Sequence, residues 1–276
     1  MIQLKAWAKI NIGLKILNKR NDGFHDLETT LATINLSDFL TLEENASGTI
    51  VEAANLKIDQ TDNLCYRAAE LFRRRYGIAR GVKIHLTKNI PVGAGLGGGS
   101  ADAAAVLKGL GKLFDMFIKD EELMELAQEI GSDVPFFIRG GAAYARGKGD
   151  ELSFFKLPRM ELALYYPGYS ISTKWAYEQY DKMLLTHEPD VDNIIPDKRK
   201  PAKKGFQLEN SFERVIFQHH PDLLDVKTKL LGTGAFFVSL SGSGSCIFAV
   251  IDDSTLPGVR KYLNSIGATY FEVVTI

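Results

Sequence analysis

The sequence has 276 residues, of which 45% are hydrophobic and 24% are charged. This is the composition of an ordinary globular protein, so it excludes a disordered or fibrous chain. The formal net charge of -1 at pH 7 argues against a surface that coats nucleic acid, and we expect no nucleic-acid partner. The length is enough for two lobes, which we expect over residues 1–157 and 158–276, with Pro158 at the boundary.

The apolar segments indicate neither secretion nor insertion into a membrane. Lys5, Lys9 and Lys15 interrupt the N-terminal apolar residues, so we expect no signal peptide. The apolar runs elsewhere are far shorter than the roughly 20 residues that span a bilayer. Cys65 and Cys246 lie far apart and lack the spacing of metal ligands, so we expect neither a disulfide framework nor a zinc site. A reducing cytoplasm fits these features.

Strands are predicted throughout the first 60 residues. Four segments rich in β-branched and aliphatic residues are separated by turn-forming residues, among them Asn21, Asp22 and Gly23, and they indicate an antiparallel region. Apolar residues at helical spacing then predict a helix over 63–76, and the arginines near its end suit a solvated helix C-terminus. The next strand is predicted at 81–89.

The later elements alternate without a regular βαβ repeat. Helices are predicted at 100–114 and 120–130, and glycine-rich strand sequence returns at 140–156. Beyond Pro158, strand and helix patterns alternate, which favours an α+β fold. Prolines and lysines between Thr186 and Gly205 indicate an exposed connector.

The segment NIPVGAGLGGGSADAAAVL, residues 89–107, places five glycines directly before a helix. Glycines let backbone N–H groups converge, and the first amides of a helix lack partners within it, so such a loop suits a phosphate. Ser100 stands where the N-cap of the helix is expected. A tight turn that binds nothing is the alternative.

Two other phosphate loops do not fit these glycines. A Walker A loop that began at Gly93 would need lysine where Gly99 stands. A dinucleotide-binding pattern can be drawn through Gly93, Gly95 and Gly98, but it needs an acidic residue about 20 positions later at the end of a strand. Asp115 instead ends the predicted helix.

The segment PVGAGLGGGSADAAA resembles the ATP-binding motif of the GHMP kinases, a superfamily that includes homoserine, mevalonate and galactose kinases. AWAKINIGLKI near the N-terminus is similar to the first motif of that family, and LSGSGSCIF near the C-terminus is similar to its third. The resemblance implies an α+β, two-lobed GHMP kinase fold. Its N-terminal lobe is expected to be ribosomal protein S5 domain 2-like, its C-terminal lobe α/β, and the active site is expected in the cleft between them.

Further segments narrow the resemblance to one branch of the GHMP kinases. NDGFHD, DNLCYRAAELF and GSDVPFFIRGGAAYARGKGDEL are similar to kinases that act on a cytidine-diphosphate sugar alcohol in the non-mevalonate isoprenoid pathway. The resemblance implies that ATP phosphorylates the 2-hydroxyl of that small-molecule substrate. Mg²⁺ is expected to accompany ATP, although no acidic pair has a spacing that identifies metal ligands.

Residue by residue, the resemblance places the catalytic lysine at Lys9, the catalytic aspartate at Asp133 and a substrate-binding asparagine at Asn11. Phosphoryl transfer needs charge compensation and a group that accepts or orients the hydroxyl proton. The lysine and the aspartate would supply these. Without the resemblance, Lys9 is an ordinary surface strand lysine and Asp133 an ordinary helix cap.

The segment NDGFHD matches the turn that recognises cytosine in this branch. Phe24 stands where the family usually has tyrosine and would stack on the base, while His25 would hydrogen-bond the polar edge of the base. A second stacking aromatic is expected at Tyr177, with Trp175 as the alternative. The resemblance also implies an ATP site and a substrate-phosphate loop; a tight hairpin between two strands is the alternative interpretation of that loop. The ATP site would comprise Asn63, Lys88, Pro91, Val92, Gly93, Ala94, Gly95, Leu96, Gly97, Gly98, Gly99, Ser100 and Ala101, and the loop Gly242, Ser243 and Gly244.

Two rival functions stay open at this point. Another GHMP kinase, of the homoserine or mevalonate type, would share the three motifs, but its substrate has no base for NDGFHD to bind. A non-catalytic nucleotide sensor with the GHMP fold could retain Lys9 and Asp133 by descent. We expect a monomer or a weak homodimer with no membrane partner.

Overall fold

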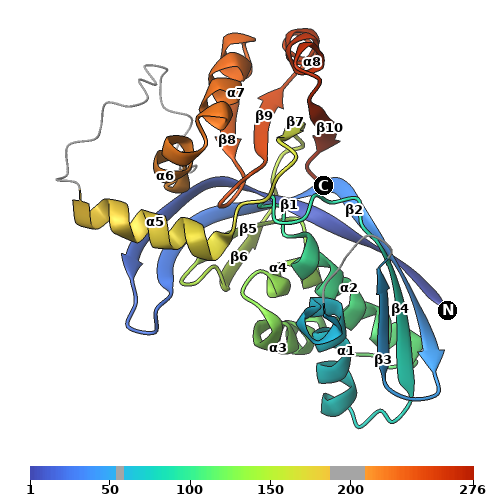
Figure 1. Ribbon diagram of the computed structural model, residues 1–276. Helices are drawn as coiled ribbons and strands as arrows, with labels where there is room; N and C mark the ends of the chain where they lie inside the picture. The colour runs from blue at the N-terminus through green and yellow to red at the C-terminus, as the bar shows by residue number, and fades with distance from the viewer. Residues whose placement is uncertain (54–58, 187–208) are drawn as a thin grey trace.

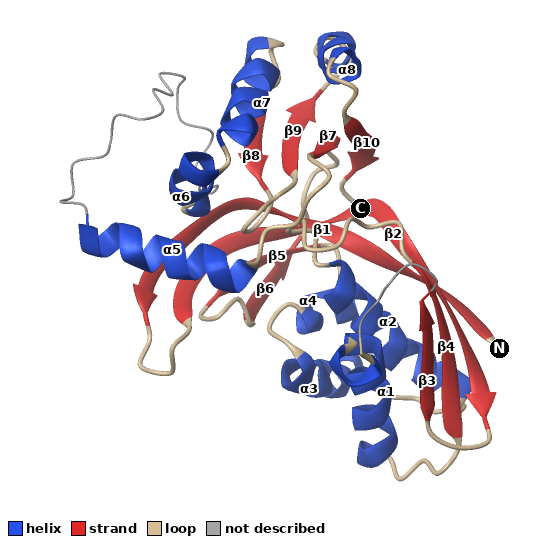
Figure 2. Ribbon diagram, in the orientation of Figure 1, coloured by secondary structure: helices blue, strands red, loops and turns tan. Residues whose placement is uncertain are grey.

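The computed structural model describes residues 1–53, 59–186 and 209–276 (Figures 1 and 2). The predicted connector between Thr186 and Gly205 therefore lies almost wholly outside the described residues. The elements, in chain order, are β1 Ile2–Lys19, β2 His25–Asn45, β3 Thr49–Ala53, the short 3₁₀ helix η1 Gln60–Asp62, α1 Leu64–Arg75, β4 Gly81–Thr87, α2 Gly98–Leu113, α3 Asp120–Ile130, α4 Val134–Arg139, β5 Ala142–Arg146, β6 Glu151–Phe155, β7 Glu161–Tyr166, α5 Thr173–Thr186, α6 Phe212–His219, α7 Pro221–Gly232, β8 Phe237–Leu240, β9 Ile247–Ile251, α8 Leu256–Ser265 and β10 Thr269–Val274.

The first sheet is built around the long antiparallel hairpin of β1 and β2. The strand order is β3-β4-β2-β5-β6, and β1 pairs with β2. The predicted turn at residues 21–23 joins the two long strands. Residues 26–36 and 39–44, two of the four segments predicted as separate strands, form one continuous β2. The register shifts between Ile12 and Leu14, where Gly13 has a φ of 73°. This bulge lies next to Ile10 and Ile12, in the middle part of β1 that passes beneath the second sheet (Figure 1).

Helices α1 to α4 pack on one face of the first sheet (Figure 2). Small residues of α2 are buried against α1 and β1, so this helix lies close to the strands. At Gly109 a Cβ would lie 2.4 Å from Leu4 Cδ1 and 2.5 Å from Leu42 Cδ1, so a larger residue there would force both leucine side chains to move. This packing fixes the N-terminal end of α2, where the glycine loop joins it.

The second sheet has the order β10-β7-β9-β8, and all of its pairs are antiparallel. Ile10 and Ile12 of β1 pack with Leu164 of β7 and Phe248 of β9 in one buried cluster. The two sheets therefore share a core. This core holds the glycine loop, which follows β4, against the β8–β9 hairpin of the second sheet. The α+β, two-lobed architecture expected from the sequence is confirmed. The division after residue 157 stays a prediction, and it falls between β6 and β7.

Candidate active site

One cavity of about 820 Å³ opens between the two lobes and takes its lining from both. The predicted residues that line it are Lys9, Asn11, Phe24, His25, Asn63, Lys88, Pro91, Val92, Gly93, Ala94, Gly95, Leu96, Gly97, Gly98, Gly99, Ser100, Asp133, Tyr177, Gly242 and Ser243. Ala101, Gly244 and Trp175 are not among the lining residues. The ring of Trp175 instead packs edge-on against His219, with ring centroids 5.1 Å apart.

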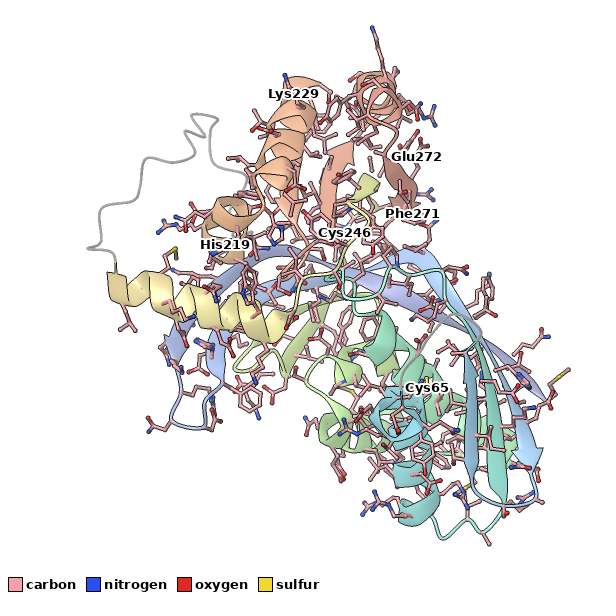
Figure 3. All side chains as sticks on the ribbon, in the orientation of Figure 1. Cys65, His219, Lys229, Cys246, Phe271 and Glu272 are labelled. Atoms are coloured by element: carbon pink, nitrogen blue, oxygen red, sulfur yellow. The ribbon has the colours of Figure 1, made fainter. Side chains whose placement is uncertain are left out.

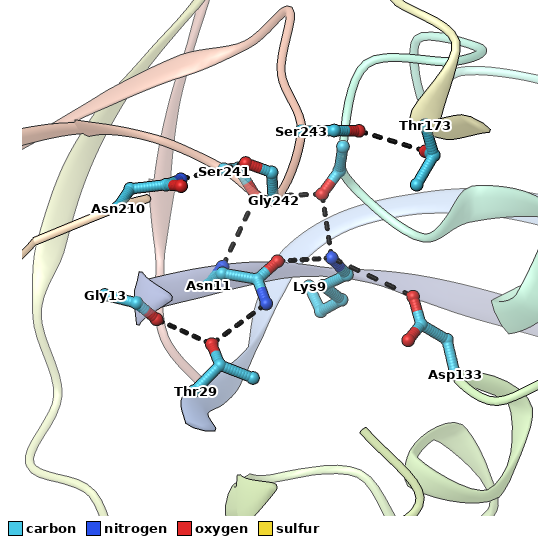
Figure 4. Close-up of polar contacts among 11 residues, drawn as sticks. Lys9, Asn11, Gly13, Thr29, Asp133, Thr173, Asn210, Ser241, Gly242 and Ser243 are labelled. Carbon is cyan, nitrogen blue, oxygen red and sulfur yellow. Dashed lines mark hydrogen bonds and ion pairs between the residues drawn. The ribbon is translucent and has the colours of Figure 1, made fainter. Parts of the chain in front are cut away.

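Lys9 lies at the centre of the polar contacts in this cavity (Figure 4). Its Nζ donates to the side-chain oxygen of Asn11 and, over 2.9 Å, to the carbonyl of Gly95. Asp133 Oδ2 lies 3.9 Å from the same nitrogen. Burial lowers the pKa of Lys9, and the charge of Asp133 partly opposes this shift. The strand lysine is therefore buried, and the surface interpretation of Lys9 is wrong.

Asp133 occupies the N-cap position of α4, but its side chain makes no capping hydrogen bond. The side chain is 41% exposed, and it lines the cavity beside Lys9. A carboxylate that caps no helix keeps its oxygens available for another donor. Asp133 thus has the position of a cap, but its side chain faces Lys9 across the cavity instead of capping the helix.

Gly97, rather than Ser100, is the N-cap of α2. Its φ of 69° is left-handed, which glycine adopts without strain, and the helix begins at the next residue. Ser100 therefore lies inside the first turn and makes no cap, so the prediction for Ser100 is wrong. The amides of residues 97–100 donate to no acceptor among the described residues. This leaves a row of free N–H groups at the positive end of the helix.

The glycine loop and the SGSGS loop meet backbone to backbone. At Gly95, a Cβ would lie 1.9 Å from the carbonyl oxygen of Ser241, and the Ser241 hydroxyl donates to the Gly95 carbonyl over 2.9 Å. At Gly97, a Cβ would meet the Phe137 ring at 2.7 Å and Lys9 at 3.1 Å. A side chain at position 97 would thus disturb packing as well as any approaching phosphate. SGSGS also forms the turn between β8 and β9. The same residues are therefore both a hairpin turn and the candidate substrate-phosphate loop.

Two buried carboxylates behind the glycine loop were not revealed by the sequence pattern. Asp38 and Asp102 both bind the ammonium of Lys88, the latter over 2.7 Å. Asp38 also accepts the amides of Asn89 and Ile90 at 2.6 and 2.8 Å, which ties β2 to the start of the loop. Their only sequence signals are single acidic residues within otherwise apolar, strand-forming or alanine-rich segments.

Burial raises the pKa of Asp102 to about 7, against the opposing effect of Lys88. Burial by itself lowers the pKa of Lys88, but Asp102 and Asp38 together raise it above its usual value. Asp102 Oδ1 is buried and has no hydrogen-bond partner among the described residues. Asp38 and Asp102 therefore compensate the charge of the Lys88 ammonium, which leaves this buried group close to charge balance.

The other end of the cavity is built from rings. His25 stacks on Tyr177 with ring centroids 4.6 Å apart and planes inclined by 14°. Phe24 is 57% exposed, and Lys148 Nζ lies 5.2 Å from the centre of its ring. The structure thus brings Phe24, His25 and Tyr177 together at this end.

The described residues contain no group of three or more His, Cys, Asp or Glu side chains placed to hold a metal ion. Within the same ranges, no helix is both long and apolar enough to cross a membrane. Cys65 and Cys246 are free and buried, and they lie in different halves of the molecule (Figure 3).

Comparison with known proteins identifies the family. The model of the GHMP kinase N-terminal domain matches residues 63–141, and the model of the GHMP kinase C-terminal domain matches residues 199–269. A 4-diphosphocytidyl-2-C-methyl-D-erythritol kinase of Chlorobium phaeobacteroides (strain BS1) is 41% identical over 91% of this chain and 90% of its own length. The chain belongs to this kinase family. A second member, from Prosthecochloris aestuarii (strain DSM 271 / SK 413), is 38% identical over 98% of this chain and 95% of its own length.

Solved structures agree with this membership. The crystal structure of a 4-(cytidine 5'-diphospho)-2C-methyl-D-erythritol kinase matches with a TM-score of 0.79 and 31% identity, and it covers all of both chains. A Methanococcus jannaschii mevalonate kinase matches with a TM-score of 0.70 but only 14% identity over 100% of this chain and 98% of its own. The second similarity shows the shared fold alone, so the mevalonate rival gains no support from it.

Proposed function

We propose that the protein transfers the terminal phosphoryl group of ATP to the 2-hydroxyl of 4-diphosphocytidyl-2-C-methyl-D-erythritol. The observation that carries this proposal is the placement of Lys9 and Asp133, whose charged atoms are 3.9 Å apart in the cavity that the glycine loop lines. A carboxylate beside a buried cation, next to unpaired helix amides, is suited to phosphoryl transfer to an alcohol.

In the proposed reaction, Asp133 accepts or orients the proton of the attacking hydroxyl. Lys9 stabilises negative charge on the transferring phosphoryl group, because its buried ammonium is held rigidly by Asn11 and Gly95. Asn11 is itself fixed by Thr29, whose hydroxyl lies 3.0 Å from the Asn11 amide nitrogen. These contacts support a group that is already in place before the substrates bind.

The ATP phosphates are proposed to accept the free amides of residues 97–100, and the adenosine is proposed to lie toward Asn63 and Lys88. The Asn63 side chain caps α1 by accepting the amide of Cys65 over 2.8 Å, so its amide nitrogen is left for a ligand. Mg²⁺ that accompanies ATP would supply charge neutralisation. The role proposed for Ala101 and Gly244 is to shape the loops from outside the cavity.

The cytosine is proposed to bind at the ring-built end, with Phe24 and Tyr177 as stacking groups and His25 at its polar edge. Replacement of the usual tyrosine by Phe24 retains the face that stacks and removes one hydroxyl. Gly242 and Ser243 are proposed to contact the phosphates of the substrate. We further propose that the enzyme acts as a monomer or weak homodimer in the reducing cytoplasm, consistent with its two free thiols.

A coupled assay of ADP release with the full chain tests this proposal. We expect turnover with the cytidine-diphosphate sugar alcohol and ATP, and none above background with homoserine or mevalonate. A ³¹P–¹H correlation spectrum of the product should show the new phosphate on the 2-oxygen. Turnover of homoserine or mevalonate in place of the cytidine substrate would overturn the substrate assignment. Binding of ATP without turnover of any of the three alcohols would favour the sensor.

A further inference from the structure

One helix holds the imidazole of His25 on two sides. Tyr177 and Asp181 are four residues apart on α5, so they lie on one face of that helix. Tyr177 covers a face of the imidazole ring, while Asp181 Oδ1 lies 2.7 Å from His25 Nε2. The His25 side chain is only 5% exposed. The plane of the ring and one of its nitrogens are therefore both fixed by α5.

The charge of Asp181 decides which ring nitrogen carries the proton. Burial alone would raise the pKa of Asp181, but hydrogen bonds from Lys19 and His25 hold this pKa below its usual value. Lys19 Nζ donates to the second carboxylate oxygen over 2.6 Å. An ionised carboxylate can only accept, so His25 Nε2 donates to it, and Nδ1 of the neutral imidazole is then an acceptor. No partner of Nδ1 occurs among the described residues.

We propose that Asp181 is a positioning residue that fixes His25 as an acceptor through Nδ1 and thereby selects cytosine over uracil. Cytosine carries an amino group at the position where uracil carries a carbonyl, so one base donates where the other accepts. A fixed acceptor pairs with the amino group and faces lone pairs on the carbonyl. The inference rests on the proposed function, because it requires a pyrimidine beside His25.

The tautomer can be measured without any substitution. In the full chain labelled with ¹⁵N-histidine, at about pH 8 where imidazoles are largely neutral, we expect His25 to show a protonated Nε2 and an unprotonated Nδ1. Assignment by comparison with a His25→Ala sample identifies the resonances. A protonated Nδ1 in the neutral ring would overturn the proposal.

The variant Asp181→Asn tests the effect on binding. Its amide can donate to Nε2, which allows the proton to move to Nδ1. We expect the KM for the cytidine substrate to rise about tenfold, the loss of one hydrogen bond, with the KM for ATP changed less than about twofold. Titration with CDP and with UDP should show that the wild-type preference for CDP is lost. The control Asp225→Asn, an exposed carboxylate on α7, should retain it.

The outcomes separate a positioning role from a structural one. If Asp181→Asn weakens CDP and UDP binding equally, Asp181 only docks α5, and the proposal is overturned. It is also overturned if wild type prefers CDP and the variant retains that preference with an unchanged tautomer, while the proposed function then stands. If the wild-type chain binds neither nucleotide and does not phosphorylate the cytidine substrate, the proposed function itself fails.

Discussion

The two ends of the cavity are built from different parts of the chain. At the end with Lys9, the contacts involve backbone: the carbonyl of Gly95 accepts both the Lys9 ammonium and the Ser241 hydroxyl, each over 2.9 Å. At the other end, the contacts are between side chains, and His25 stacks on Tyr177. Changes at the backbone-built end should therefore affect fold and chemistry together. Changes at the ring-built end should affect the affinity for one substrate.

The largest effect is expected at the backbone-built end, for the variant Asp133→Asn. An amide cannot accept the hydroxyl proton, so kcat should fall by about 10²–10⁴-fold, the usual contribution of general base catalysis. The affinity for ATP, measured by titration calorimetry, should change little, because the glycine loop is untouched. Near-normal kcat would remove Asp133 from the proposed chemistry and leave Lys9 as the main catalytic group.

The variant Gly95→Ala should give the next largest effect, and it should reduce stability as well as activity. Alanine at a φ of 79° is strained by about 1–3 kcal/mol, and the Cβ would lie 1.9 Å from the Ser241 carbonyl, so the two loops must separate. We expect a lower midpoint of chemical unfolding and a loss of turnover. Gly77→Ala is the matched control, because Gly77 has a similar left-handed φ of 65°, lies outside the cavity lining and would place its Cβ within 4 Å of nothing. Equal losses for both variants would show that the contact between loops is not the cause.

Much of this arrangement could be predicted from sequence, because its signals are local. The turn at residues 21–23, the helix after Asn63 and the glycine loop each depend on neighbouring residues, and the structure contains all three. The contacts of Asp38 with Lys88 and of Asp181 with His25 join residues 50 and 156 positions apart. No local pattern encodes such pairs, and tertiary packing alone creates them. Ser100 was mispredicted as a cap because left-handed glycine ends the loop three residues earlier.

Asp102 offers a pH test of the backbone-built end. Its pKa in the folded state is raised to about 7, so between about pH 4 and pH 7 the folded state binds the proton more tightly than the unfolded state does. The free energy of unfolding should therefore fall with rising pH in this window, by up to about 1.4 kcal/mol per pH unit from this group. Asp102→Asn should remove that slope, as measured by urea unfolding at several pH values. An unchanged slope would show that Asp102 titrates well below this window.

His25→Ala should give the smallest of these effects and should be confined to one substrate. The imidazole lies in the cavity and contacts Tyr177 and Asp181, so its removal takes away the proposed partner of the base edge. The KM for the cytidine substrate should rise about tenfold, consistent with one or two lost hydrogen bonds. The KM for ATP should stay close to its wild-type value, because no backbone contact between the loops changes. If the KM for ATP rose equally, the two ends of the cavity would be coupled, and the division between a backbone-built and a ring-built end would not describe how the enzyme binds its substrates.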